Sequence, residues 1–147
     1  FFNQTQLTGE TIALFKQSNQ LDSIFIPKDP FIRSPNDSLN YDNQIKGNFL
    51  EGKLKEKSID FLEFNGNSKM KYFDNNIENK SVLGINNIEA GKIKILFNNN
   101  NIKSILCTNQ VESNHIELDE TKMTKQKIKE LTELDGYQIY SINVLKN

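Results

Sequence analysis

Short apolar runs separated by polar turn-forming residues make up most of the chain. Examples are Ile59–Phe64 and Ile93–Phe97, which are followed by the asparagine-rich segments Asn65–Asn67 and Asn98–Asn101. Asparagine tolerates left-handed backbone angles and bonds to its own backbone, and therefore suits tight turns. Many short runs of this kind, with β-branched and aromatic residues, predict antiparallel strands and an all-β fold.

One pattern recurs in three segments of the chain, Gly9–Ile26, Gly47–Phe64 and Gly91–Cys107. Each begins with glycine, continues as a strand, breaks at a polar turn and returns as a second strand. The return strands align as LDSIFI, IDFLEF and IKSILC, and their fourth and sixth positions are apolar in every copy. Because alternate residues of a strand point to one face, we expect these positions to share an inward face. They are Ile24, Ile26, Leu62, Phe64, Ile105 and Cys107. Repeated antiparallel hairpins predict a stacked architecture in which each unit buries its apolar side against the next.

The pattern changes near the C-terminus. In Glu120–Leu134, apolar residues recur at intervals of three from Ile128 onward, among many charges. This spacing predicts a short amphipathic helix that Gly136 caps. The helix is expected to pack on the last strand or to hang off it, with docking on a partner as the alternative. The chain is therefore divided into a β-repeat domain, residues 1–112, and a partly helical C-terminal extension, residues 113–147.

Length and charge exclude several classes of protein. The 147 residues, 36% of them hydrophobic, allow one domain with a modest core. The 18 basic and 19 acidic residues give a formal net charge of -1, so no basic surface indicates a nucleic-acid partner. No apolar run approaches the ~20 residues of a membrane-spanning helix. The chain starts at Phe1 rather than methionine, so we expect a fragment or a processed form.

No set of converging catalytic or metal-binding residues is evident in the sequence. His115 is the only histidine and lies in a polar stretch, which favours a surface position. Cys107 is the only cysteine, so it forms no internal disulfide and is expected to be a buried strand residue. Phosphate-loop, nucleophile-elbow and zinc-protease motifs are absent. We therefore predict no enzymatic activity, no catalytic residues, no metal site and no cofactor.

Two groups of strand residues have weaker functional interpretations. The carboxylates are expected to point outward rather than to form an acid pair, and they are Glu51, Asp60 and Glu63. In the absence of tryptophan, three aromatic side chains remain as candidates for stacking on a sugar ring, and they are Tyr41, Tyr72 and Phe73.

Several motifs together resemble a known family. Asp42–Gly47 (DNQIKG) resembles a D-Q-I-K-G signature, and Asn65–Tyr72 resembles a glycine–asparagine turn followed by a strand. Gly84–Asn87 and Lys92–Ile102 resemble a following "G-V-N-K … I-T-I-Y-F … N-K-V" block. Their order, over about Leu21 to Val111, is similar to that of the OstA-like proteins of Bacteroidetes. These are relatives of the periplasmic lipopolysaccharide-transport protein LptA and of the N-terminal domain of the outer-membrane assembly protein LptD.

The resemblance implies a fold and a function. The fold is an open β-roll (a β-taco, or β-jellyroll of the LptA type) of two facing sheets, which stack end to end into a periplasmic groove for lipopolysaccharide. In that case Ile24, Ile26, Leu62, Phe64 and Ile105 line the lipid groove. The implied partners are lipopolysaccharide or its lipid A part, and other lipopolysaccharide-transport proteins bound through the sheet edges. Head-to-tail self-association is also implied, and the implied location is the periplasm, associated with the envelope.

A second interpretation stays open. A structural β-repeat, such as a surface or adhesive solenoid without a lipid ligand, accounts equally well for the inward apolar pairs. A sugar-modifying enzyme on a β-roll fits least. The first two differ in whether the interior is open to a ligand or filled by its own side chains. The 10 phenylalanines permit a filled core, so the sequence leaves the choice open.

Overall fold

Antiparallel strands form nearly all of the described structure, which is a computed structural model covering residues 4–36, 39–75 and 82–139. Residues 140–147 of the expected C-terminal extension lie outside the described residues. The expected all-β class with one short helix is confirmed. In chain order the strands are β1 (Gln6–Thr8), β2 (Ala13–Gln17), β3 (Gln20–Ile26), β4 (Phe31–Pro35), β5 (Asp42–Lys46), β6 (Phe49–Lys55), β7 (Ser58–Asn75), β8 (Val82–Asn98), β9 (Asn101–Thr108) and β10 (Glu112–Asp119).

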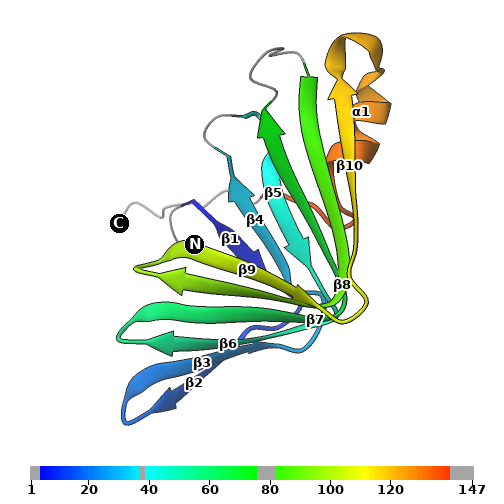
Figure 1. The fold of residues 1–147 in the computed structure, drawn as a ribbon. Coiled ribbons are helices and arrows are strands. Elements are labelled where there is room, and N and C mark those ends of the chain that lie inside the picture. Colours follow the sequence, from blue (N-terminus) through cyan, green and yellow to red (C-terminus); the bar gives the residue numbers. More distant parts are fainter. Residues whose placement is uncertain (1–3, 37–38, 76–81, 140–147) are drawn as a thin grey trace.

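The sheet is folded into two walls that share the long strands β7 and β8 (Figure 1). Wall 1 consists of β2, β3, β6, residues 58–65 of β7, residues 92–98 of β8, and β9, in that order. Wall 2 consists of β1, β4, β5, residues 69–75 of β7, residues 82–89 of β8, and β10. The chain therefore passes from one wall to the other several times. Figure 1 shows the walls spreading apart from the bend in β7 and β8.

The bend lies where β7 and β8 lose their regular pairing. The register between them shifts from Asn65 to Ser68. Within that shift, Gly66 and Asn67 have positive φ angles of 75° and 43°. A bulge with left-handed residues bends a strand and increases its twist, while the strand itself continues. The asparagine-rich segment Asn65–Asn67 is therefore a bend inside β7 and not a turn between two strands.

The three repeated segments are hairpins, and all of them lie in wall 1. They are β2–β3, β6–β7 and β8–β9. Each has a two-residue turn in which both residues have positive φ, and these turns are Ser18–Asn19, Glu56–Lys57 and Asn99–Asn100. Turns of this type match the right-handed twist of the flanking strands. The sequence repeat therefore corresponds to one hairpin of wall 1 and excludes the strands of wall 2.

The C-terminal helix α1 (Lys125–Thr132) follows a short 3-10 turn, η1 (Glu120–Lys122), within the expected range Glu120–Leu134. The Thr124 hydroxyl caps its N-terminus by accepting a bond from the amide of Lys127. The expected cap at Gly136 is wrong. The helix ends at Thr132, and Gly136 lies in a later turn that the amide of Tyr137 closes onto the carbonyl of Leu134 at 3.0 Å.

Helix α1 packs on the outer face of wall 2, as the first of the two sequence interpretations expected. Beneath it is a second apolar cluster, here called the helix-side cluster, with a buried centre of Phe73, Leu83, Ile85 and Leu118. The helix contributes Ile128 and Leu131 to this cluster. The sheet continues through β10 to Asp119, beyond residue 112, where the sequence analysis ends the β-repeat domain.

Candidate functional site

The inner face of wall 1 carries two continuous apolar rows that run across its strands. The first row is Ile24, Gly52, Leu62, Ile95 and Ile105, and the second is Ile26, Leu50, Phe64, Ile93 and Cys107. Directly opposed residues on neighbouring strands stabilise a sheet through side-chain contact. The six repeat positions therefore share one inward face, in register across the wall.

The five residues predicted to line a lipid groove differ in how deeply they are buried. Ile26, Leu62 and Phe64 are fully buried, at 0% exposure. They pack in one cluster with Ile32, Ile45 and Met70 of wall 2. Near the bend, the space between the walls is therefore filled by side chains. Ile24 and Ile105 are only half-buried and lie at the edge of this cluster.

Glycine at position 52 is required by the close packing of the first row. A Cβ atom there would lie 2.6 Å from Cγ2 of Ile24 and 2.7 Å from Cδ2 of Leu62. Both distances are shorter than van der Waals contact, so the missing side chain allows these two residues to approach each other across β6. The side chains of Ile24 and Leu62 therefore fill the space that a side chain at position 52 would occupy.

Further from the bend, a cavity of about 350 Å³ opens between the walls. It is lined by Ile95, Phe97, Asn100, Asn101, Ile102 and Ile105 of wall 1 and the adjoining turn, and by Thr5, Ile32, Ser34, Asn43, Ile45, Met70 and Tyr72 of wall 2 and its N-terminal edge. Of the five predicted groove residues, only Ile105 lines it. Tyr72 and Ile102 stand at its mouth, 45% and 52% exposed.

Sequence reasoning missed the mouth of the cavity, although a signal for it was present. Phe97 and Ile102 are the second cross-strand pair from the Asn99–Asn100 turn, after Asn98 and Asn101. The corresponding second pair from the Glu56–Lys57 turn is Leu54 and Ile59. Apolar residues on both sides of a hairpin turn, at matching positions, indicate an inward face that continues to the turn.

The inner face of wall 2 changes character along its strands. Close to the bend it carries a row of apolar residues: Leu7, Ile32, Ile45, Met70 and Ile88. Two residues further out, the same face carries Thr5, Ser34, Asn43 and Tyr72. The hydroxyls of Thr5 and Ser34 lie 3.0 Å apart, and the side-chain oxygen of Asn43 accepts a bond from the amide of Phe73. The cavity therefore has an apolar floor and a neutral, polar side on wall 2, with Asn100 and Asn101 at the turn adjoining wall 1.

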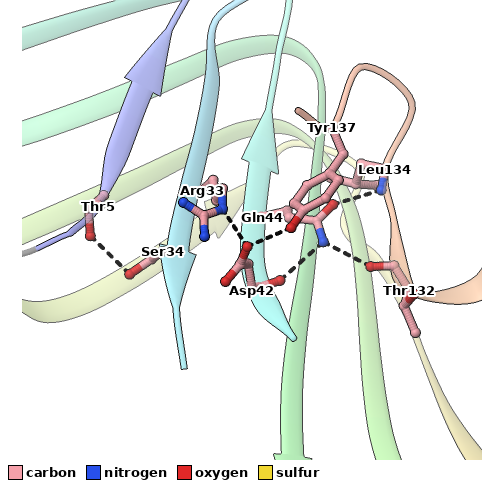
Figure 2. Close-up of polar contacts among 8 residues, drawn as sticks. All are labelled: Thr5, Arg33, Ser34, Asp42, Gln44, Thr132, Leu134 and Tyr137. Carbon is pink, nitrogen blue, oxygen red and sulfur yellow. Dashed lines mark hydrogen bonds and ion pairs between the residues drawn. The ribbon is translucent and has the colours of Figure 1, made fainter. Parts of the chain in front are cut away.

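The outer face of wall 2 is held by a C-terminal strap, residues 132–137, which crosses β5 (Figure 2). Gln44 is 1% exposed, and its amide donates to the carbonyl of Thr132 at 2.8 Å and accepts from the amide of Leu134 at 2.7 Å. Asp42 accepts bonds from Arg33 and from the hydroxyl of Tyr137. Burial and the bond to Asp42 raise the pKa of Tyr137. Wall 2 is thus packed on both faces.

The remaining candidate residues form no second site in the described ranges. His115 is exposed on β10, with its Nδ1 atom 2.8 Å from the side-chain oxygen of Asn86. Cys107 is half-buried in the second row, and burial raises its thiol pKa. No cluster of three metal-ligating side chains is present in residues 4–36, 39–75 and 82–139. Over the same residues, no helix is long and apolar enough to cross a bilayer.

The expected outward carboxylates and stacking aromatics have different outcomes. Glu51 and Asp60 are exposed, and Glu63 pairs with Lys92 at 3.1 Å. Stacking by Phe73 on a ligand is excluded because this residue is 1% exposed beneath the helix. Tyr41 stacks on that ring at 5.5 Å, and burial, with a bond to Glu120, raises its pKa to about 12. Only Tyr72 faces the space between the walls.

No protein-family model matches the chain, and no curated protein matches it. What the structure defines is a fold class, an antiparallel sheet folded into an open roll of two walls with a short helix on one outer face.

Proposed function

We propose that the chain is a lipid-binding module of outer-membrane assembly, located in the periplasm, which carries lipopolysaccharide by its acyl chains. The observation that carries this proposal is the open, mainly apolar cavity between the two walls. The motif resemblance supplies the particular lipid and the location. No enzymatic step, metal or cofactor enters the proposal.

Such a cavity suits an acyl chain for simple physical reasons. Moving one methylene group out of water is favourable by ~0.8 kcal/mol, without any directional contact. An apolar cavity between two walls therefore provides affinity while letting the acyl chain slide. Sliding is what a carrier needs, because tight directional bonds would slow release.

The edges of the walls support contacts with other modules. Within the described residues, β1 and β2 at one end and β9 and β10 at the other each pair with a single neighbour. Unpaired strand edges offer backbone donors and acceptors to a strand from another chain. Apolar residues are exposed at both edges of wall 1, with Leu14 53% and Leu106 49% exposed. Head-to-tail association follows, and sedimentation over a concentration series measures it; a mass that stays monomeric at every concentration contradicts it.

A matched pair of variants tests the lipid proposal. Ile102 and Leu106 lie on the same strand and are 52% and 49% exposed, but only Ile102 lines the cavity. Replacing Ile102 with aspartate removes apolar contact worth roughly 1.5–3 kcal/mol, so we expect lipid binding to weaken about tenfold or more. Leu106→Asp should bind as the unmodified chain does. Displacement of a fluorescent lipid by lipopolysaccharide measures both.

The alternative, a structural β-repeat without a ligand, is favoured by one observation. Ile26, Leu62 and Phe64 are fully buried, so much of the interior is filled. Under this alternative, neither lipopolysaccharide nor any long-chain lipid binds the unmodified chain. That result, or equal weakening by Ile102→Asp and Leu106→Asp, would reject the carrier function.

A further inference from the structure

The size of the cavity limits what it can hold. Its volume of about 350 Å³ is near the lower end of ligand sites, which range over roughly 300–1,000 Å³. A water molecule occupies about 30 Å³ in the liquid, and a methylene group is of similar size. The cavity therefore holds on the order of a dozen methylene-sized groups, which is one medium-length acyl chain and not several.

The distribution of polar groups in the cavity determines which way round an acyl chain would lie. Toward the bend, both walls present aliphatic or thioether side chains, such as Ile45 and Met70 on one side and Ile95 on the other. Toward the mouth, wall 1 stays apolar with Phe97 and Ile102, as described above. Wall 2 becomes polar there, and Asn100 and Asn101 of the turn adjoining wall 1 add amide groups. A ligand matching this arrangement has its tail near the bend and a hydrogen-bonding group at the mouth, where the polar side chains lie.

The polar side of the cavity is also uncharged. Its side chains are hydroxyls and amides, and no lysine, arginine, histidine, aspartate or glutamate is among the lining residues. An ionised carboxylate or phosphate entering the cavity would lose water without gaining a counter-charge, which is costly. An ester or amide carbonyl needs only a neutral donor, and such donors are present.

Tyr72 is well placed to be that donor. It projects from β7 at the mouth and is 45% exposed. Within the described part of the chain its hydroxyl makes no hydrogen bond, whereas Thr5 and Ser34 bond to each other. A phenolic hydroxyl can donate to a carbonyl while its ring covers the first methylenes of the chain.

We infer that the cavity takes one acyl chain of about a dozen carbons, joined to its headgroup by an uncharged ester or amide that Tyr72 binds. This inference rests on the proposed function, because it names the ligand class for the same cavity. A lipid with several chains would then place only one of them in each module.

A homologous series of ligands tests the chain length. Monoacylglycerols from octanoyl to octadecanoyl are titrated against the full chain, below their micelle-forming concentrations, with displacement of N-phenyl-naphthylamine as the readout. We expect affinity to rise about fourfold per added methylene up to about dodecanoyl and then to level off. A two-chain diacylglycerol should bind no more tightly than its one-chain counterpart.

A second comparison tests the uncharged linkage and Tyr72. At neutral pH the free fatty acid should bind more weakly than the glycerol ester of the same chain. Tyr72→Phe should weaken the ester about two- to tenfold, the value of one hydrogen bond. The same variant should leave the matching alkyl glycerol ether unchanged, since an ether oxygen is a weak acceptor.

The outcomes separate this inference from the proposed function. Affinity that keeps rising to octadecanoyl, or tighter binding of the two-chain lipid, overturns the single-chain inference but leaves a lipid carrier. Equal binding of acid and ester, or equal weakening of ester and ether by Tyr72→Phe, overturns the assigned linkage. Failure of every long-chain lipid to bind rejects the inference together with the proposed function.

Discussion

Gln44 joins the C-terminal strap to the sheet, and replacing it should separate the two. Its side chain is 1% exposed, and its amide bonds the carbonyls of Thr132 and Asp42 and the amide of Leu134. Gln44→Leu keeps a similar volume but leaves the strap groups without their partner. An unsatisfied buried backbone group costs about 1–3 kcal/mol, so the two strap contacts together predict a loss of about 2–6 kcal/mol in the free energy of unfolding.

The isosteric variant Gln44→Glu adds a pH signature. The ionised carboxylate still accepts from Leu134 but faces the carbonyl oxygens of Thr132 and Asp42, so burial and repulsion favour its protonated form. The pKa of the introduced carboxyl group in the folded state should then rise above its unfolded value of about 4.3. Stability is retained below this unfolded pKa and falls as pH rises through the folded-state pKa, because the folded state holds the proton longer.

Urea unfolding at several pH values measures both variants against the unmodified chain. We expect Gln44→Glu to approach the unmodified stability at pH ~4 and to lose it toward pH ~8, while the deficit of Gln44→Leu stays constant. Hydrogen exchange over α1 should accelerate in both variants at neutral pH. A Gln44→Glu chain as stable as the unmodified one at every pH would refute the role given to this amide.

Two further predictions concern a turn and a lysine. Glu56 and Lys57 have φ angles of 50° and 67° in their turn. Replacing them with Asn-Gly should stabilise the chain by about 1 kcal/mol, and raise Tm by about 3 °C in calorimetry; a lower Tm contradicts this. Burial, with a contribution from Lys69, lowers the pKa of Lys71 below 10.5. The unfolded state then binds more protons just below pH 10.5, so stability should rise with pH there. Lys71→Met should lack this rise in urea titrations, and an identical pH profile in the variant contradicts the assignment.

Much of wall 1 could be predicted from the sequence because its hairpins repeat. The apolar fourth and sixth positions of the return strands located Ile24, Leu62 and Ile105 on one face, and the structure places them in one row. The arrangement of strands in wall 2 was not predicted from the residues alone, because these strands follow no repeat. The motif resemblance implied two facing sheets, but it did not assign strands to them.

The bend at Asn65–Asn67 shows why local signals were insufficient. Left-handed residues appear both in hairpin turns and in bulges, and asparagine and glycine suit either. At Asn99 and Asn100 they reverse the chain, whereas at Gly66 and Asn67 they bend a strand that continues. The difference depends on the pairing of distant strands, which the local sequence does not contain.

The positions that repeat and the positions that line the cavity differ for a physical reason. Every hairpin has apolar residues at the positions equivalent to Leu62 and Phe64, because the walls must be held together near the bend. Leu62 and Phe64 are both 0% exposed. Truncating such a residue costs about 2–5 kcal/mol of stability, so those positions tolerate little variation for function. Toward the turns the walls separate, and the pairs there vary from Lys16–Leu21 to Leu54–Ile59 to Phe97–Ile102. Only the last pair lines the cavity. The cavity therefore lies where the repeat is relaxed and not where it is strongest.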